Sequence, residues 1–274
     1  MLSRKFFPLL LVLLIPVFPS SAQNSEQLQV GPPPLHRAEP PRAGATSEEL
    51  EKQGDQLRVE KNFLDALDYY QAALKRNPTN AELLNRSGIC ELMLHRYKEA
   101  KKSFERAIKA DHNLANAYNN LGAVLYELAV VDRKDGNYKK AIVQYDKAIA
   151  LDSESASYLS NRGAAYFARK EYEKAALDYG AALKLDPDIF ERTSRAGVQA
   201  QLASPEDRSR YEYVLAKLYA KMGENDRSLH YLRKAMEDGY KDIRDVYKDT
   251  EFAALRKDPR FAELMASKPT AIPE

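Results

Sequence analysis

The sequence of 274 residues contains one cysteine, four histidines and no tryptophan. A single cysteine excludes a disulfide framework, an iron–sulfur cluster and a cysteine-rich zinc site. No two histidines have the i, i+4 spacing that places two metal ligands on one helix face, and no phosphate-binding glycine loop, nucleophile elbow or zincin motif occurs. We therefore expect no metal site, no cofactor and no catalytic residues.

The sequence also lacks an excess of charge of either sign. It has 42 basic and 40 acidic residues, and two of the basic ones, Arg4 and Lys5, lie in residues 1–22, which hold no acid. Removal of that segment would leave 40 residues of each sign. A neutral chain argues against nucleic acid or an anionic membrane as the main partner.

Residues 1–22 have the pattern of a secretory signal peptide. A basic start precedes an apolar run over residues 6–18, and small residues end the segment at Ala22. The run has 13 residues, fewer than the roughly 20 that a membrane helix needs. We expect export with cleavage near Ala22 and no stable membrane span afterwards, although a retained anchor stays open. The one glycosylation-type tripeptide, Asn85-Arg86-Ser87, falls inside an expected helix, where modification is not expected. Together with the lack of disulfides, this favours a bacterial protein that is periplasmic or secreted.

Residues 23–46 are expected to form a disordered linker. The segment has few large apolar residues, so it buries too little surface to offset the entropy of ordering it. It carries five prolines, which favour extended backbone: Pro32, Pro33, Pro34, Pro40 and Pro41.

The rest of the chain is a repeat with a period of 34 residues, the distance that separates Gly54, Gly88 and Gly122. This period is typical of stacked helical hairpins. Small residues and an aromatic follow the glycine at fixed offsets, as expected where helix axes approach closely and a ring fills the adjoining space. The matching sets are Gly54, Ala66, Tyr70, Ala73; Gly88, Ala100, Phe104, Ala107; and Gly163, Ala175, Tyr179, Ala182.

This pattern resembles the tetratricopeptide repeat family, from Ser47 to about Gly239. The resemblance implies an all-α fold, a right-handed superhelical solenoid of antiparallel helix pairs. The expected divisions are repeats at 47–80, 81–114, 115–155 (with a seven-residue insertion) and 156–187, an inserted helix and connector at 188–208, a degenerate fifth repeat at 209–239, and C-terminal capping helices and tail at 240–274.

In the third repeat the landmarks after Gly122 come seven residues late, which is close to two helical turns. We expect a longer helix pair with its turn at Asp135-Gly136-Asn137. Its apolar residues form either a docking ridge or a cover for a neighbouring helix; they are Leu125, Leu128, Val130 and Val131.

Two further helix starts are expected near the end of the chain. Residues 189–203 have helical composition, and Ser204 with Pro205 then provides a cap and a first helical residue. Asp258-Pro259 begins a terminal helix that covers the open end of the solenoid.

The resemblance implies that first helices line a concave groove and that the residue two before each glycine points into it. These positions hold Lys52, Arg86, Asn120 and Asn161, with Tyr126 and Phe167 further along the same helices. In the peptide-binding repeats of O-linked N-acetylglucosamine transferase, asparagines at this position grip a peptide backbone. The lysine–asparagine carboxylate clamp of chaperone-binding members is absent, because Glu51 and Asp55 stand at the corresponding positions.

The sequence thus predicts a non-catalytic scaffold or adaptor of the cell envelope that binds an extended protein segment in the groove. Cys90, on the packed side of a helix, is interpreted as a buried inert thiol. Two other interpretations stay open: an accessory subunit of an envelope enzyme or assembly machine, and a cell-wall or glycan binder. As candidate catalytic residues, the inserted segment 189–203 supplies only Glu191, Arg192 and Arg195, and it contains no pair of base and nucleophile.

Overall fold

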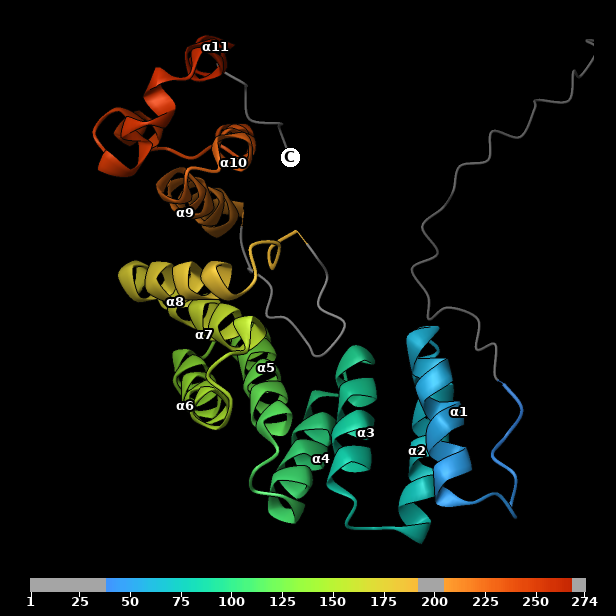
Figure 1. The fold of residues 1–274 in the computed structure, drawn as a ribbon. Coiled ribbons are helices and arrows are strands. Elements are labelled where there is room, and N and C mark those ends of the chain that lie inside the picture. Colours follow the sequence, from blue (N-terminus) through green and yellow to red (C-terminus); the bar gives the residue numbers. More distant parts are fainter. Residues whose placement is uncertain (1–37, 192–204, 268–274) are drawn as a thin grey trace, which may run out of the picture. The chain divides into compact units, whose positions relative to one another are not determined.

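The computed structural model describes residues 38–191 and 205–267, and the regular elements of these two segments are all helices (Figure 1). The first four pairs are α1 (Ser47–Val59) and α2 (Phe63–Arg76), α3 (Ala81–Met93) and α4 (Tyr97–Ala110), α5 (Ala115–Asp132) and α6 (Asp135–Leu151), and α7 (Ala156–Ala168) and α8 (Tyr172–Leu185). A fifth pair and short terminal helices follow: α9 (Pro205–Met222), α10 (Asn225–Glu237), the 3₁₀ helices η1 (Ile243–Tyr247), η2 (Thr250–Ala253) and η3 (Leu255–Lys257), and α11 (Pro259–Ser267). The predicted all-α solenoid of antiparallel helix pairs is confirmed.

Two of the helices, α1 and α3, begin at a residue whose side chain accepts a free backbone N–H group. Thr46 caps α1 in a capping box, in which the Glu49 N–H donates to its hydroxyl and the Thr46 N–H donates to the Glu49 carboxylate. The Asn80 side chain accepts from the Leu83 N–H and caps α3. Pro205 and Pro259 are the first residues of α9 and α11, as expected for a residue that has no N–H to satisfy.

Each of the first four repeats is held together by a glycine against an aromatic ring. A Cβ added at Gly122 would lie 2.5 Å from the ring of Tyr145, and at Gly88 it would lie 2.7 Å from that of Phe104. Gly54 and Gly163 stand in the same relation to tyrosines of α2 and α8. These rings are fully buried, so the helices of each pair can approach this closely only without a side chain at the glycine.

The two helices of every repeat are joined through one residue in the left-handed conformation. The residue after it donates its N–H to a carbonyl five positions earlier, which closes the end of the first helix in a Schellman-type turn. Four of these residues carry a side chain, at a cost of about 1 kcal/mol each relative to a right-handed conformation. The five residues are Lys61, His95, Arg133, Lys170 and Gly223.

The third repeat has the predicted longer helix pair. Helix α5 has 18 residues where α3 has 13, and α6 has 17 where α4 has 14. The predicted turn at Asp135-Gly136-Asn137 is wrong, because these residues form the first turn of α6 and the connection lies at Arg133 and Lys134. Leu125, Leu128 and Val130 pack on the core, whereas Val131 is 60% exposed.

Residues 38–46, predicted as part of a disordered linker, instead lie against the first repeat. The Tyr69 hydroxyl donates to the carbonyl of Glu39 at 2.8 Å, and the Arg76 guanidinium donates to the carbonyl of Ala43 at 2.8 Å. Both bonds go to backbone carbonyls, which any sequence offers, so composition gave no sign of them. Residues 1–37, with the expected leader and most of the linker, lie outside the described residues.

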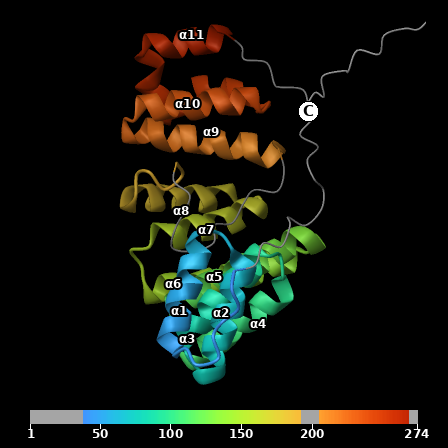
Figure 2. The same ribbon diagram turned by 90° about the vertical axis from the view of Figure 1, so that its right-hand side faces the viewer.

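The fifth pair and the terminal helices share one core. Figure 2 shows α8, α9, α10 and α11 following one another as successive layers. Phe261 and Leu264 of α11 are buried in the same cluster as Leu215 and Leu232, so the terminal helix covers the last pair as predicted. Helix α9 begins at Pro205, four residues before the expected start of the fifth repeat, and the expected extra helix lies mainly in residues 192–204, outside the described residues.

We expect Gly122→Ala to lower the free energy of unfolding by about 1–3 kcal/mol, because the new methyl group overlaps a ring that has no room to move. Gly136→Ala is the matched control: it lies in α6 with open space around it, and the higher helix propensity of alanine raises stability by up to about 1 kcal/mol. Chemical denaturation measures both changes. Equal midpoints for the two variants would show that the glycine–ring contact does not limit the helix approach.

Candidate functional site

The structure places four of the six predicted groove residues in the interior. Asn120 and Asn161 are 1% and 2% exposed, and Tyr126 and Phe167 are fully buried. The expectation that these side chains face an open groove is therefore wrong. Only Lys52 and Arg86 lie at the surface, on α1 and α3.

The two buried asparagines belong to a chain of amides that joins three first helices. Asn161 of α7 donates to Asn119 of α5 at 2.9 Å, and Asn119 donates to Asn120 at 3.3 Å. Asn120 then donates to Asn85 of α3 at 3.0 Å. Each amide thus satisfies a neighbour in this chain, which is how polar groups are tolerated in an interior. Asn85 and Asn119 were missed by sequence reasoning, although both stand one residue before a predicted groove position.

The two predicted groove aromatics fill space between helices. Tyr126 packs edge-on against Tyr138 of α6, with ring centroids 5.2 Å apart. Phe167 meets the rings of Tyr172 and Tyr211 at 5.0 and 6.1 Å. Both therefore contribute to the cores between repeats.

Arg86 bridges the first two repeats. Its guanidinium donates to the carboxylates of Glu51 and Asp55, the latter at 2.9 Å. Asp55 also accepts from the Tyr70 hydroxyl at 2.7 Å. The cation predicted to attract an acidic ligand is thus neutralised by two acids of α1, and Lys52 is the one predicted groove cation that stays exposed without such a partner among the described residues.

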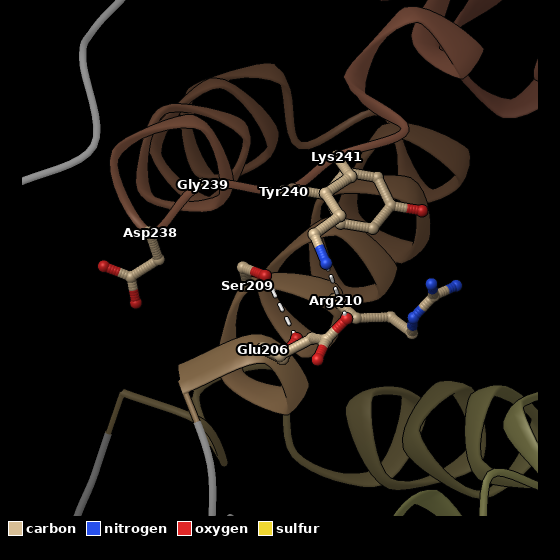
Figure 3. A pocket seen from close by; sticks show the side chains of 7 residues that line it. All are labelled: Glu206, Ser209, Arg210, Asp238, Gly239, Tyr240 and Lys241. Atoms are coloured by element: carbon tan, nitrogen blue, oxygen red, sulfur yellow. Dashed lines mark hydrogen bonds and ion pairs between the residues drawn. The ribbon is translucent and has the colours of Figure 1, made fainter.

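A pocket of about 210 Å³ lies where α9 begins and α10 ends (Figure 3). Its charged groups are engaged within the protein: Lys241 pairs with Glu206 at 3.2 Å, and Asp238 pairs with Arg208 at 3.9 Å. The Ser209 hydroxyl donates to the backbone carbonyl of Glu206 at 3.0 Å. The Arg210 guanidinium lies 4.8 Å from the ring centroid of Tyr172. The pocket does not bring a nucleophile and a base together.

Glu212 is a buried carboxyl group close to this pocket along α9. It is 8% exposed, and its Oε2 atom has no hydrogen-bond partner. Burial raises the pKa of Glu212 to about 7, and the nearby negative charge of Asp238 adds to the rise. Lys234 and Arg208 oppose the rise, and Glu237 adds a small further increase.

The single cysteine and the possible metal ligands give no reactive site among the described residues either. Cys90 is fully buried, and burial raises the pKa of its thiol to about 12, so at neutral pH it is protonated and a poor nucleophile. Within the described residues no three His, Cys, Asp or Glu side chains come close enough to hold a metal ion. In the same part of the chain no helix is long and apolar enough to cross a bilayer.

These features define a module of stacked helical hairpins whose polar interior fixes neighbouring repeats to one another. Family models described as tetratricopeptide repeat match residues 57–125, 156–189 and 210–237, and one described as TPR repeat matches 131–168. The chain belongs to the tetratricopeptide repeat family, and such repeats make it a scaffold for protein–protein interaction.

Curated relatives match over about half of this chain. Small glutamine-rich tetratricopeptide repeat-containing protein 2 of Saccharomyces cerevisiae is 26% identical over 57% of this chain and 41% of its own length. Hsp70-Hsp90 organizing protein 3 of Arabidopsis thaliana is 32% identical over 50% of this chain and 22% of its own length. The chain therefore spans less than half the length of these relatives.

Two solved structures share the fold. A thermophilic TPR protein of Thermus thermophilus has a TM-score of 0.51 at 24% identity, over 81% of this chain and 100% of that one. The PilF protein of Pseudomonas aeruginosa has a TM-score of 0.52 at 16% identity, over 81% and 97% of the two chains. At these identities the likeness shows the fold alone.

We expect Asn120→Ala to lower the free energy of unfolding by about 1–3 kcal/mol, because it leaves Asn85 and Asn119 without their buried partner. The exposed Asn113→Ala is the control and should change stability by less than about 0.5 kcal/mol. Denaturation midpoints of both variants provide the measurement. A stable Asn120→Ala variant would mean that the amide chain does not hold the repeats together.

Glu212 gives a pH dependence with a defined sign. Its folded-state pKa lies above the ordinary value of 4.5, so the folded chain binds the proton more tightly than the unfolded chain, and stability falls as the pH rises from about 4.5 to about 7. Burial also raises the pKa of Glu91 and Glu127, so Glu212→Gln should reduce this fall, whereas the exposed Glu263→Gln should leave it unchanged. Denaturation midpoints across this pH range measure the effect, and an unchanged slope in Glu212→Gln would assign it to other groups.

Proposed function

We propose that the chain is a non-catalytic scaffold of the cell envelope, exported by residues 1–22, whose first helices hold an extended segment of a partner protein. Membership of a family that acts through protein binding supports the scaffold role, and the leader pattern supports the location. The observation that carries the proposal is the continuity of the first helices: α3 contacts α5 directly, and α5 contacts α7.

A continuous row of first helices suits an extended ligand because one segment can touch several repeats in turn. The buried amide chain fixes these helices relative to one another before any partner arrives. A surface that is already rigid loses less conformational entropy on binding, so the same contacts give higher affinity.

The charge at the first repeat bears on the kind of partner. Several relatives of this chain are named Hsp70-Hsp90 organizing proteins. Here Glu51 and Asp55 occupy the surface of α1, and both engage Arg86. A peptide bound through its terminal carboxylate would meet these two acids, so we propose that recognition uses internal residues of the partner.

The glycan-binding alternative would need exposed aromatic rings in the groove, and the two predicted groove aromatics do not provide them. Glycan recognition by stacking requires exposed aromatic rings on the binding face, but Tyr126 and Phe167 are buried. Among the described residues Tyr247 of η1 is the one aromatic side chain with more than half of its area exposed, and it lies outside the repeats.

The proposal predicts a partner contact on the first helices and none on the second. A photo-crosslinking amino acid placed at Lys52 of α1 in the full chain should capture a protein partner in the living cell. The matched control is Leu177 of α8, which is 74% exposed on a second helix, and the probe there should capture nothing above background. Capture from Leu177 alone would move binding to the second helices, and capture from neither position would contradict the scaffold proposal.

A further inference from the structure

The ends of the first helices carry exposed apolar side chains. Val59 is the last residue of α1 and is 72% exposed, and Met93 is the last residue of α3 and is also exposed. Val131, next to the last residue of α5, is likewise exposed. Because successive first helices run in the same direction, their carboxyl ends lie along the same edge of the solenoid.

A cation follows at most of these ends, at the residue with left-handed backbone. Lys61, Arg133 and Lys170 have φ angles of 64°, 53° and 61°. All three are exposed, and none forms an ion pair with another residue in the described segments. In the second repeat the residue at this position is His95, whose ring nitrogen lies 2.8 Å from the Tyr97 hydroxyl.

The turn itself does not require these cations. In the fifth repeat Gly223 closes an identical turn without any side chain, and glycine adopts this conformation with the least strain. Strained backbone that keeps a long charged side chain is a reason to look for a role of that side chain outside the turn.

The longer third repeat moves part of this edge outward. Helix α5 runs five residues further past its glycine than α3 does, which corresponds to about 7 Å at the helical rise per residue. Val131 and Arg133 therefore project beyond the turns of the neighbouring repeats. We call the six residues concerned the hairpin edge: Val59, Lys61, Met93, Val131, Arg133 and Lys170.

We propose that the hairpin edge is a docking surface for an acidic polypeptide segment that also carries apolar side chains. The inference rests on the proposed scaffold function and specifies the chemistry of its partner. Each unpaired cation binds one carboxylate of the partner, which is the stronger class of hydrogen bond. The apolar side chains beside the cations bury against those of the partner.

A polypeptide fits this edge better than an anionic bilayer does. The same turns carry acids, among them Glu60, Asp132 and Glu171, and residues 23–274 hold equal numbers of acidic and basic groups. A bilayer responds to the summed positive charge of a surface, which is small here. Separate carboxylates on a polypeptide pair with the cations one at a time and do not need a net positive field.

An extended segment also matches the spacing of the repeats. Packed helices lie roughly 8–10 Å apart, and extended backbone advances about 3.3 Å per residue. One partner residue in about every three therefore reaches the next first helix. The probe chosen below has this period.

The test measures binding of the purified chain to a fluorescent peptide of five Glu-Ser-Val repeats, with five Lys-Ser-Val repeats as the control peptide. We expect the acidic peptide to bind at least tenfold more tightly than the basic one. The triple variant Lys61→Gly, Arg133→Gly, Lys170→Gly should lose at least tenfold in affinity while its denaturation midpoint stays equal or rises, because glycine relieves the left-handed strain. This combination separates a binding role from a structural one.

Matched variants sharpen the result. Glycine inside a helix would lower stability by itself, so the control is Lys75→Gln, Lys102→Gln, Lys109→Gln, which removes three exposed cations of α2 and α4 away from the edge. It should bind the acidic peptide within twofold of the unmodified chain. Val59→Ser, Met93→Ser, Val131→Ser together should lose at least tenfold.

Three results would overturn the inference. The first is unchanged affinity in the glycine triple variant, and the second is no binding of the acidic peptide at millimolar concentration. The third is that the unmodified chain binds vesicles of phosphatidylglycerol and phosphatidylcholine but not the acidic peptide, and that the glycine triple variant no longer binds the vesicles. If the Lys52 probe still captures a partner in the glycine variant at the original level, the scaffold function stands and only the hairpin edge fails.

Discussion

The contact between a glycine and an aromatic ring sets the separation of the two helices in each of the first four repeats. The ring occupies the space that a Cβ would need, and it is buried on every side. Since the interior is close-packed, only one helix separation satisfies both conditions. Each pair also closes with a left-handed residue at the same place in its turn, which keeps the connection short. The regular solenoid is therefore a consequence of a contact that lies within a single repeat.

The same constraint decides which insertions the fold accepts. The third repeat is seven residues longer because α5 exceeds α3 by five residues and α6 exceeds α4 by three, while the connection is one residue shorter. These residues are added at the hairpin end, beyond the glycine–ring contact. Ala141, Tyr145 and Ala148 consequently stay on the buried face, and Tyr145 still reaches Gly122. The third repeat is thus longer than its neighbours without any change in the way it packs.

The local origin of these contacts explains how much could be predicted from the sequence. The glycines and aromatics meet inside one repeat, so their spacing along the chain revealed the helix pairs. Asn120 and Asn161 are buried because they bond to Asn85 and Asn119. Two of these bonds join different repeats, so the residue pattern within one repeat cannot predict the burial. The turn after α5 was misplaced because Gly136 is a common turn residue, whereas the chain turns earlier, at Arg133. Residues 38–46 are held by bonds to backbone carbonyls, which leave no trace in composition.

The buried amides and the exposed hairpin edge are linked by the stiffness of the repeats. A binding surface made of one or two side chains per repeat keeps its geometry only if the repeats do not move relative to one another. The amide chain opposes such movement, since any shift between α3, α5 and α7 leaves buried donors or acceptors without partners. A partner that touches a single hairpin gains nothing from this stiffness, whereas one that spans several repeats gains at each of them. The sequence predicted that Asn120 and Asn161 bind a peptide directly. In the structure they instead hold the repeats in place, and so position the surface that a polypeptide would contact.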